Sequence, residues 1–180
     1  MAPDCDEEVV HRAGLPPAET ARRLARAKAE SVYAREPSAV VIGSDQVCAL
    51  GERCLHKPGT AERAVDQLLK MQGRTHALHT AVCILGPGEA EPPGSGFAGA
   101  GPRCFEHLDT TELAMRVLSR EQIERYVARD QPLDCAGSYK LEQAGIALFG
   151  AIRSADQTAI VGLPLVTVVT LLARFGIDAV

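Results

Sequence analysis

Three short stretches of the sequence combine side chains suited to acid–base chemistry and to anion binding. The first is "VVIGSDQVCAL", residues 40–50, in which Asp45 and Gln46 follow an apolar run. We place Asp45 at the C-terminal end of a strand, and ligands in open α/β sheets gather beyond the carboxyl ends of strands. There an acid can hold a metal ion or take a proton from water, although a turn or capping role is the plainer alternative.

The second stretch is "HKPGT", residues 56–60, which places Lys57 just before the expected start of a helix. Pro58 keeps the preceding Lys57 extended, and a helix N-terminus offers free N–H groups and the positive end of its dipole. This combination suits a phosphate group. The alternative is a solvated lysine on the surface, which is the more common situation for a single Lys.

The third stretch is "CAGSYKLEQAG", residues 135–145, with Ser138, Lys140 and Glu142 at every second position. On a strand, side chains with this spacing share one face, so a hydroxyl, a cation and an acid would lie together. The alternative is the solvated face of an edge strand. The pair His76 and His79 is not expected to bind metal, because on a strand the two side chains would point to opposite faces.

The elements that must position these residues alternate along the chain. Helical spacing and capping residues predict helices at 17–35, at 61–72 after Thr60, at 119–128 from a Ser119–Gln122 capping box, and at 162–176 closed by Gly176. The Val and Thr content of 162–176 would also suit a strand. Strand patterns cover residues 38–43, 75–85, 104–113 and 144–152. The interleaving predicts an α/β fold in a single domain, 1–180, with the Gly- and Pro-rich segment 86–103 as a flexible loop insertion.

Composition limits the partners of the chain. Of its 180 residues 46% are hydrophobic and 23% charged, and the formal net charge of −4 disfavours nucleic-acid polymers and anionic membrane surfaces. No apolar run is long enough to cross a membrane, and the first residues do not resemble a signal peptide. Six cysteines without a C-x-x-C pair favour a reducing, cytoplasmic environment over a disulfide framework.

Taken together and in this order, the motifs resemble the Maf family of nucleotide pyrophosphatases. The matching stretches are "IGSDQV", "HKPGTAERAVDQLLKMQG", "YVARDQPLDCAGSYKLEQAGIALF" and "VGLPL". The likeness spans nearly the whole chain except the 86–103 segment, and "SDQ" with "CAGSYKLE" looks like the branch that cleaves 7-methyl-GTP. The fold this implies is a mixed, twisted sheet flanked by helices, similar to that of the inosine triphosphatases.

The resemblance also implies a reaction and roles for individual residues. N7-methyl-GTP would be hydrolysed to N7-methyl-GMP and diphosphate with the help of a divalent metal cation, Mg²⁺ or Mn²⁺. Asp45 would be the proton acceptor and a metal ligand, and Glu7 of "DCDEE" matches a family acid near the metal or the substrate. Gln46 and Glu142 would select the substrate, and Lys28, Lys57 and Lys140 would bind phosphate. A homodimer is also a family-level expectation.

One family feature has no counterpart in the printed sequence. Family members begin with a strand and a Ser-x-Ser-Pro-x-Arg loop that grips the phosphates, whereas this sequence starts just before "DEE". Two other functions therefore stay open. The first is a division-linked, nucleotide-binding regulatory protein with little turnover, and the second is a pyrophosphatase for other nucleotides such as dTTP or UTP.

Overall fold

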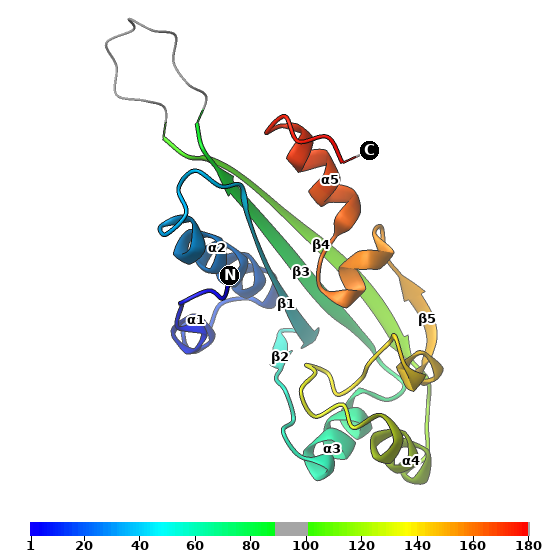
Figure 1. Ribbon diagram of the computed structural model, residues 1–180. Helices are drawn as coiled ribbons and strands as arrows, with labels where there is room; N and C mark the ends of the chain where they lie inside the picture. The colour runs from blue at the N-terminus through cyan, green and yellow to red at the C-terminus, as the bar shows by residue number, and fades with distance from the viewer. Residues whose placement is uncertain (89–100, 180) are drawn as a thin grey trace, which may run out of the picture.

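The protein is built around one five-stranded sheet with helices on both faces (Figure 1). The computed structural model describes residues 1–88 and 101–179. The helices are α1 (Glu7–Arg12), α2 (Pro17–Tyr33), α3 (Ala61–Met71), α4 (Arg120–Asp130) and α5 (Leu165–Ala173), with 3₁₀ turns η1 (Ala144–Leu148) and η2 (Gln157–Val161). The strands are β1 (Val41–Leu50), β2 (Arg53–Leu55), β3 (Thr75–Gly86), β4 (Arg103–Met115) and β5 (Phe149–Arg153).

The strands lie in the order β2-β1-β3-β4-β5, and every described pairing is antiparallel. The α/β fold class is therefore confirmed, and the sheet is antiparallel in its described part where the family likeness implied a mixed one. The strands β3 and β4 pair up to Gly86 and Arg103, so the segment between them joins the two arms of a hairpin. Most of the predicted loop insertion, residues 89–100, lies outside the described residues.

Three apolar clusters hold the helices on the sheet. On one face the alanines of α2 pack against Val41 and Val47 of β1 and Ala81 of β3. On the opposite face α5 packs against Val82 and Ile84 of β3, and Figure 1 shows α2 and α5 on the two sides of the sheet. The largest cluster lies at one end, where α3 and α4 cover the sheet. Small alanines on α2 let that helix approach the strands closely.

The predicted helices are confirmed, including the Thr60 cap of α3 and the Ser119–Gln122 capping box of α4. The short helix α1 was not predicted, although Asp6 caps it and its first turn is acidic, which favours a helix start. Within residues 144–152, the first five form η1 and the strand begins only at Phe149.

The structure contradicts one predicted strand boundary and one expectation that depended on an extended conformation. The first strand does not end near residue 43 but runs to Leu50, so Asp45 lies in the middle of β1. The rule about carboxyl ends of parallel strands does not apply to an antiparallel sheet. Residues 135–143 do not form a strand, because Gly137 and Ser138 both have positive φ, at 81° and 61°. These angles turn the chain and remove the shared face expected for Ser138, Lys140 and Glu142.

Among the described residues, no helix has the length and apolar character needed to cross a membrane.

The close approach of α2 to β1 depends on Gly43. A Cβ atom at this position would lie 2.6 Å from the backbone nitrogen of Ala29 and would collide with the carbonyl oxygen of Ala25. We therefore expect Gly43→Ala to push α2 off the sheet and to lower the free energy of unfolding by about 1–3 kcal/mol, the usual cost of overpacking. Urea unfolding followed by circular dichroism measures this loss.

The matched control is Gly150→Ala on β5, where an added Cβ would meet nothing closer than 3.7 Å. Equal stability of the Gly43→Ala and Gly150→Ala variants would contradict the role of Gly43.

His76 is a buried titratable residue in the largest cluster. Its Nε2 atom lies 2.9 Å from the hydroxyl of Tyr139, its Nδ1 atom has no hydrogen-bond partner among the residues that the structure describes, and burial lowers its pKa to about 4. Between about pH 6.5 and 4 the unfolded chain takes up a proton that the folded chain does not. Stability should therefore fall as the pH drops through this window, by up to about 3 kcal/mol from this residue alone.

The variant His76→Gln can still hydrogen-bond to Tyr139 but does not titrate, so its unfolding free energy should depend less on pH in this window. His107→Gln on β4, outside this cluster, is the matched control for replacing a histidine by glutamine. The same slope in all three proteins would show that His76 does not carry the effect.

Candidate functional site

Two hollows meet at the edge of β1, because the neighbouring strand β2 is too short to cover it. The pairing of β2 with β1 begins only at Cys48, so no strand of the described residues covers this side of Asp45, Gln46 and Val47. A cavity of about 430 Å³ lies on one side and one of about 250 Å³ on the other. Both are lined by Gln46, Lys57 and Ala136, so they are neighbours that share a wall.

The larger cavity contains a lysine held between two carboxylates. The Lys28 ammonium lies 2.6 Å from Oδ1 of Asp45 and 3.0 Å from Oε1 of Glu7. The Asp45 side chain is only 12% exposed and that of Lys28 20%, whereas Glu7 is 49% exposed at the cavity mouth. Three of the residues that the sequence singled out, from α1, α2 and β1, are therefore brought together.

The packing of α2 explains how Lys28 reaches Asp45. Ala25 and Ala29 lie directly against Gly43 of β1, and Lys28 lies on the same turn of the helix. Asp45 follows Gly43 by two residues, so both point to the face that α2 covers. The small residues at the contact thus bring the ammonium and the carboxylate within hydrogen-bonding distance.

Burial and charge act in opposite directions on this pair. Burial is the largest influence on Asp45 and raises its pKa, and it outweighs the hydrogen bond and charge of Lys28, which lower it. Burial would lower the pKa of Lys28, but its hydrogen bonds to Asp45 and Glu7 together raise it. The lysine therefore stays charged, while the carboxylate is a stronger base than an exposed aspartate.

Gln46 points to the opposite face of β1 from Asp45. Its Nε2 atom donates to the hydroxyl of Thr80 at 2.9 Å and to the carbonyls of Ala159 and Ile160 at 2.8 and 3.1 Å. Because carbonyl oxygens only accept, these contacts identify the NH₂ end of the amide. The carbonyl end of Gln46 has no recorded partner among the described residues, so it remains available as an acceptor.

Asp156 holds the segment that orients Gln46. Its carboxylate accepts from the backbone N–H of Thr158 and of Val166, both at 2.9 Å. These bonds tie η2, which presents Ala159 and Ile160, to the start of α5. The sequence analysis did not identify this supporting role of Asp156.

Lys57 lines both cavities. It is exposed and forms no ion pair with any residue that the structure describes. It lies three residues before the Thr60 cap of α3, as the sequence predicted. An unpaired cation on the shared wall can contact an anion that extends between the two hollows.

Two histidines of the larger cavity were missed by the sequence analysis. The rings of His11 and His56 contact each other edge to face, with centroids 5.2 Å apart. His56 directly precedes Lys57, and His11 follows the acidic start of α1. Their only signal in the sequence was proximity to the motifs, because the contact joins residues far apart in the chain.

Lys140 and Glu142 lie on the irregular segment between α4 and η1, and their side chains have different surroundings. Glu142 is exposed and lines the smaller cavity together with Tyr139. The Lys140 ammonium forms an ion pair with Asp134 at 3.1 Å, and its backbone N–H donates to the hydroxyl of Tyr126. Lys140 does not line either of the two cavities.

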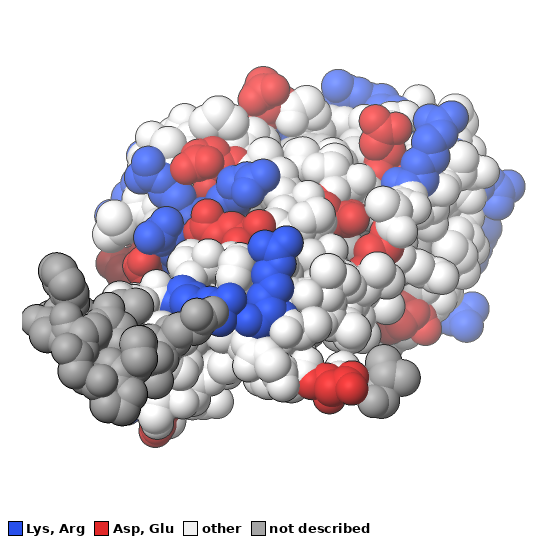
Figure 2. Space-filling model, turned by 90° about the horizontal axis from the view of Figure 1, so that it is seen from above, with Lys and Arg blue, Asp and Glu red and all other residues white. Residues whose placement is uncertain are grey.

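The charge pattern of the larger cavity suits a polyanion bound next to a base catalyst. Lys28 and Lys57 supply positive charge, and Asp45 is a buried carboxylate with a raised pKa. On the face shown in Figure 2, acidic and basic side chains are interspersed and no broad basic area spans the surface.

Two groups of residues have donor atoms for a metal ion, and they differ in chemistry. Glu7 and Asp45 offer carboxylate oxygens in the larger cavity, which suit hard cations such as Mg²⁺ or Mn²⁺. Cys83, Cys104 and Glu106 lie together on β3 and β4 and supply two sulfur atoms, which do not suit Mg²⁺. A cation that assists with phosphates therefore fits the first group.

Comparison with known proteins agrees with this geometry. A family profile described as "Maf-like protein" matches residues 1–175. Proteins named 7-methyl-GTP pyrophosphatase from Xanthomonas axonopodis pv. citri and Pseudomonas putida are 47% and 42% identical over 176 residues, which is 98% of this chain and 84% of each relative. One with the same name from Bdellovibrio bacteriovorus is 43% identical over 92% of this chain and 79% of its own length. The resemblance seen in the sequence motifs is confirmed.

Proposed function

We propose, from the premise that this chain belongs to the Maf family, that it is a nucleoside triphosphate pyrophosphatase acting on N7-methyl-GTP. The products are N7-methyl-GMP and diphosphate. The observation that carries the proposal is the contact of Lys28 with Asp45 and Glu7 inside a cavity at the open edge of β1. It supports the proposal because a carboxylate and a cation lie together in a cavity that is open at a strand edge.

The triphosphate occupies the larger cavity in this proposal. Lys28 and Lys57 neutralise phosphate charge as it develops on the leaving diphosphate. Lys140 was also expected to bind phosphate. Its ion pair with Asp134 and its position outside the cavity walls support a structural role instead, in which it holds the 134–142 segment in place.

Asp45 accepts a proton from the attacking water. The water oxygen bonds to the α-phosphorus as the bond to the bridging oxygen breaks, and the electron pair leaves with diphosphate. Oδ1 of Asp45 is held by Lys28 at 2.6 Å, and no contact within the described residues engages Oδ2. One oxygen thus orients the carboxylate while the other can take the proton.

Glu7 and Asp45 are the residues that would hold a divalent cation in this cavity, since their oxygens match its preferences. Such an ion, when bound, would supply charge neutralisation for the triphosphate.

The nucleobase of the substrate occupies the smaller cavity on the other side of β1. The free carbonyl oxygen of Gln46 can accept from the N–H groups on the Watson–Crick edge of guanine. Glu142 can accept there too, and its charge favours the positively charged ring of 7-methylguanine. The nucleotide therefore spans the uncovered strand edge, with Lys57 and Ala136 between its two ends.

A second copy of the chain is the partner we propose for an exposed apolar surface at the C-terminal helix. Val161, Leu165, Val166 and Val169 are 76%, 46%, 67% and 41% exposed, although they belong to one turn and one helix. Sedimentation of the full chain would reveal a monomer if this is wrong.

The six free cysteines support a reducing cytoplasm as the location.

The test of the function is diphosphate release with Mg²⁺ from N7-methyl-GTP, compared with GTP, dTTP and UTP. We expect the methylated nucleotide to be preferred. Asp45→Asn keeps the size of the side chain but not the base, and should lower kcat by about 10²–10⁴-fold. Equal turnover of all four nucleotides would contradict the substrate, and an active Asp45→Asn variant would contradict the mechanism.

The dependence of kcat/KM on pH, measured for the wild type and for Lys28→Gln, tests the role of Asp45 as the base. Asp45 acts when deprotonated, so kcat/KM should fall on the acid side, at a higher pH than for an ordinary aspartate because burial raises its pKa. Lys28→Gln removes the charge that lowers this pKa, and the acid limb should move further up. If the acid limb of kcat/KM lies at the same pH in Lys28→Gln and in the wild type, the group that titrates in this profile is not Asp45.

Substrate selection is tested at Glu142. The variant Glu142→Gln should lower kcat/KM for N7-methyl-GTP about 10-fold more than for GTP, because only the methylated ring is positively charged. Glu124→Gln, on the exposed face of α4, is the control and should change neither value. Equal losses on both nucleotides would remove Glu142 as the selecting residue.

A further inference from the structure

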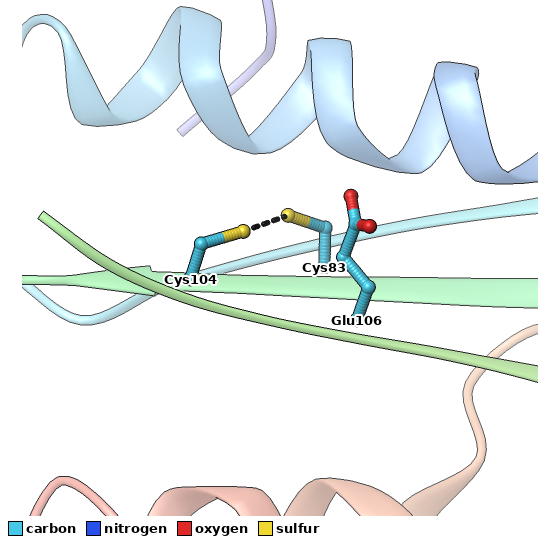
Figure 3. A group of neighbouring side chains, drawn as sticks. All are labelled: Cys83, Cys104 and Glu106. Carbon is cyan, nitrogen blue, oxygen red and sulfur yellow. Dashed lines mark hydrogen bonds between the residues drawn. The ribbon is translucent and has the colours of Figure 1, made fainter.

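Two cysteines and a glutamate gather on the face of the sheet that α2 covers, outside the nucleotide cavities. Cys83 on β3 lies opposite Glu106 on β4, and Cys104 precedes Glu106 by two residues, so all three share one face. Figure 3 shows the three side chains projecting from the two strands toward α2. None of them lines either of the two cavities described above.

The spacing of these side chains matches a tetrahedral metal site. The two sulfur atoms are 3.8 Å apart, and the sulfur and carboxylate ligand atoms all lie within 4.8 Å of one another. In a tetrahedral site with metal–sulfur bonds of about 2.3 Å, two thiolates lie about 3.8 Å apart. A disulfide would require about 2.0 Å, which is far shorter than the observed separation.

We propose that Cys83, Cys104 and Glu106 bind one thiophilic divalent cation, of the class of Zn²⁺, at a site distinct from the nucleotide cavity. Two thiolates and one carboxylate supply three ligands, and water supplies the fourth. On binding, both thiols lose their protons and form two metal–sulfur bonds, so that no oxidant or reductant is needed.

The surroundings of the three side chains are compatible with the replacement of thiol protons by a metal ion. Burial, together with the neighbouring thiol, raises the pKa of Cys83 well above its usual value, so the site releases protons when a metal binds. Cys104 is exposed, and the Glu106 side chain is 34% exposed, so an ion can enter from solvent. Arg26 lies 3.7 Å from Glu106 but is closer to Glu30, at 2.8 Å, and therefore keeps a partner if Glu106 turns to the metal.

The same helix contacts both sites. Arg26 faces Glu106 while Lys28, two residues on, holds Asp45. A cation on β3 and β4 joins the two strands below α2 and should stabilise the fold without taking part in the chemistry. The metal that assists catalysis would differ, because it needs oxygen ligands.

The experiment is a titration of reduced, metal-free protein with Co²⁺ alone under anaerobic conditions. We expect one Co²⁺ per chain, with a thiolate-to-cobalt charge-transfer band and the visible bands of a tetrahedral site. Zn²⁺ should displace the Co²⁺ and abolish these bands. Cys104→Ser should weaken binding by about 100-fold or more, and Glu106→Gln by about 10-fold.

Cys104 is exposed, so its replacement should leave the fold intact, which circular dichroism checks. Cys5→Ser, near the N-terminus and outside the group, is the control and should bind Co²⁺ like the wild type. The proposal fails if the reduced protein shows no charge-transfer band or if Cys104→Ser leaves the spectrum unchanged. It also fails if mass spectrometry finds that Cys83 and Cys104 form a disulfide in place of binding metal.

Discussion

The close packing of α2 on β1 at Gly43 is the contact on which the site depends. Since there is no room for a Cβ atom between Gly43 and Ala29, the helix backbone lies almost against the strand. That distance lets the Lys28 ammonium reach Asp45 at 2.6 Å and places the carboxylate under the helix, where burial raises its pKa. A larger residue at the contact would separate the cation from the base and expose both to water.

The short strand β2 provides the second constraint. If β2 paired with the whole of β1, the edge at Asp45 and Gln46 would be covered. Because its pairing begins at Cys48, adjacent side chains on the two faces of one strand are both accessible. The alternation of side chains along a strand then separates the two tasks that we propose, hydrolysis at Asp45 and recognition of the base at Gln46.

Local patterns were enough to find helices α2 to α5, but not α1, and most of the candidate residues. Thr60 and the Ser119–Gln122 pair cap helices where expected, because capping involves residues three or four apart. Asp45 was identified as a candidate from its acidic side chain, but it was placed at the end of its strand and lies in the middle. The shared face of Ser138, Lys140 and Glu142 depended on an extended conformation, which the positive φ angles at Gly137 and Ser138 exclude and which alternation of polar residues alone does not specify.

The sequence by itself determined the family, through motifs spread over nearly the whole chain, and with it the α/β class and the residue types that can act on a triphosphate. Only the tertiary structure decided which of them meet. It brought Lys28 and Glu7 to Asp45, paired Lys140 with Asp134, and placed Cys83 beside Cys104. These contacts join residues up to 21 positions apart and depend on helix packing and strand register, which no local pattern specifies.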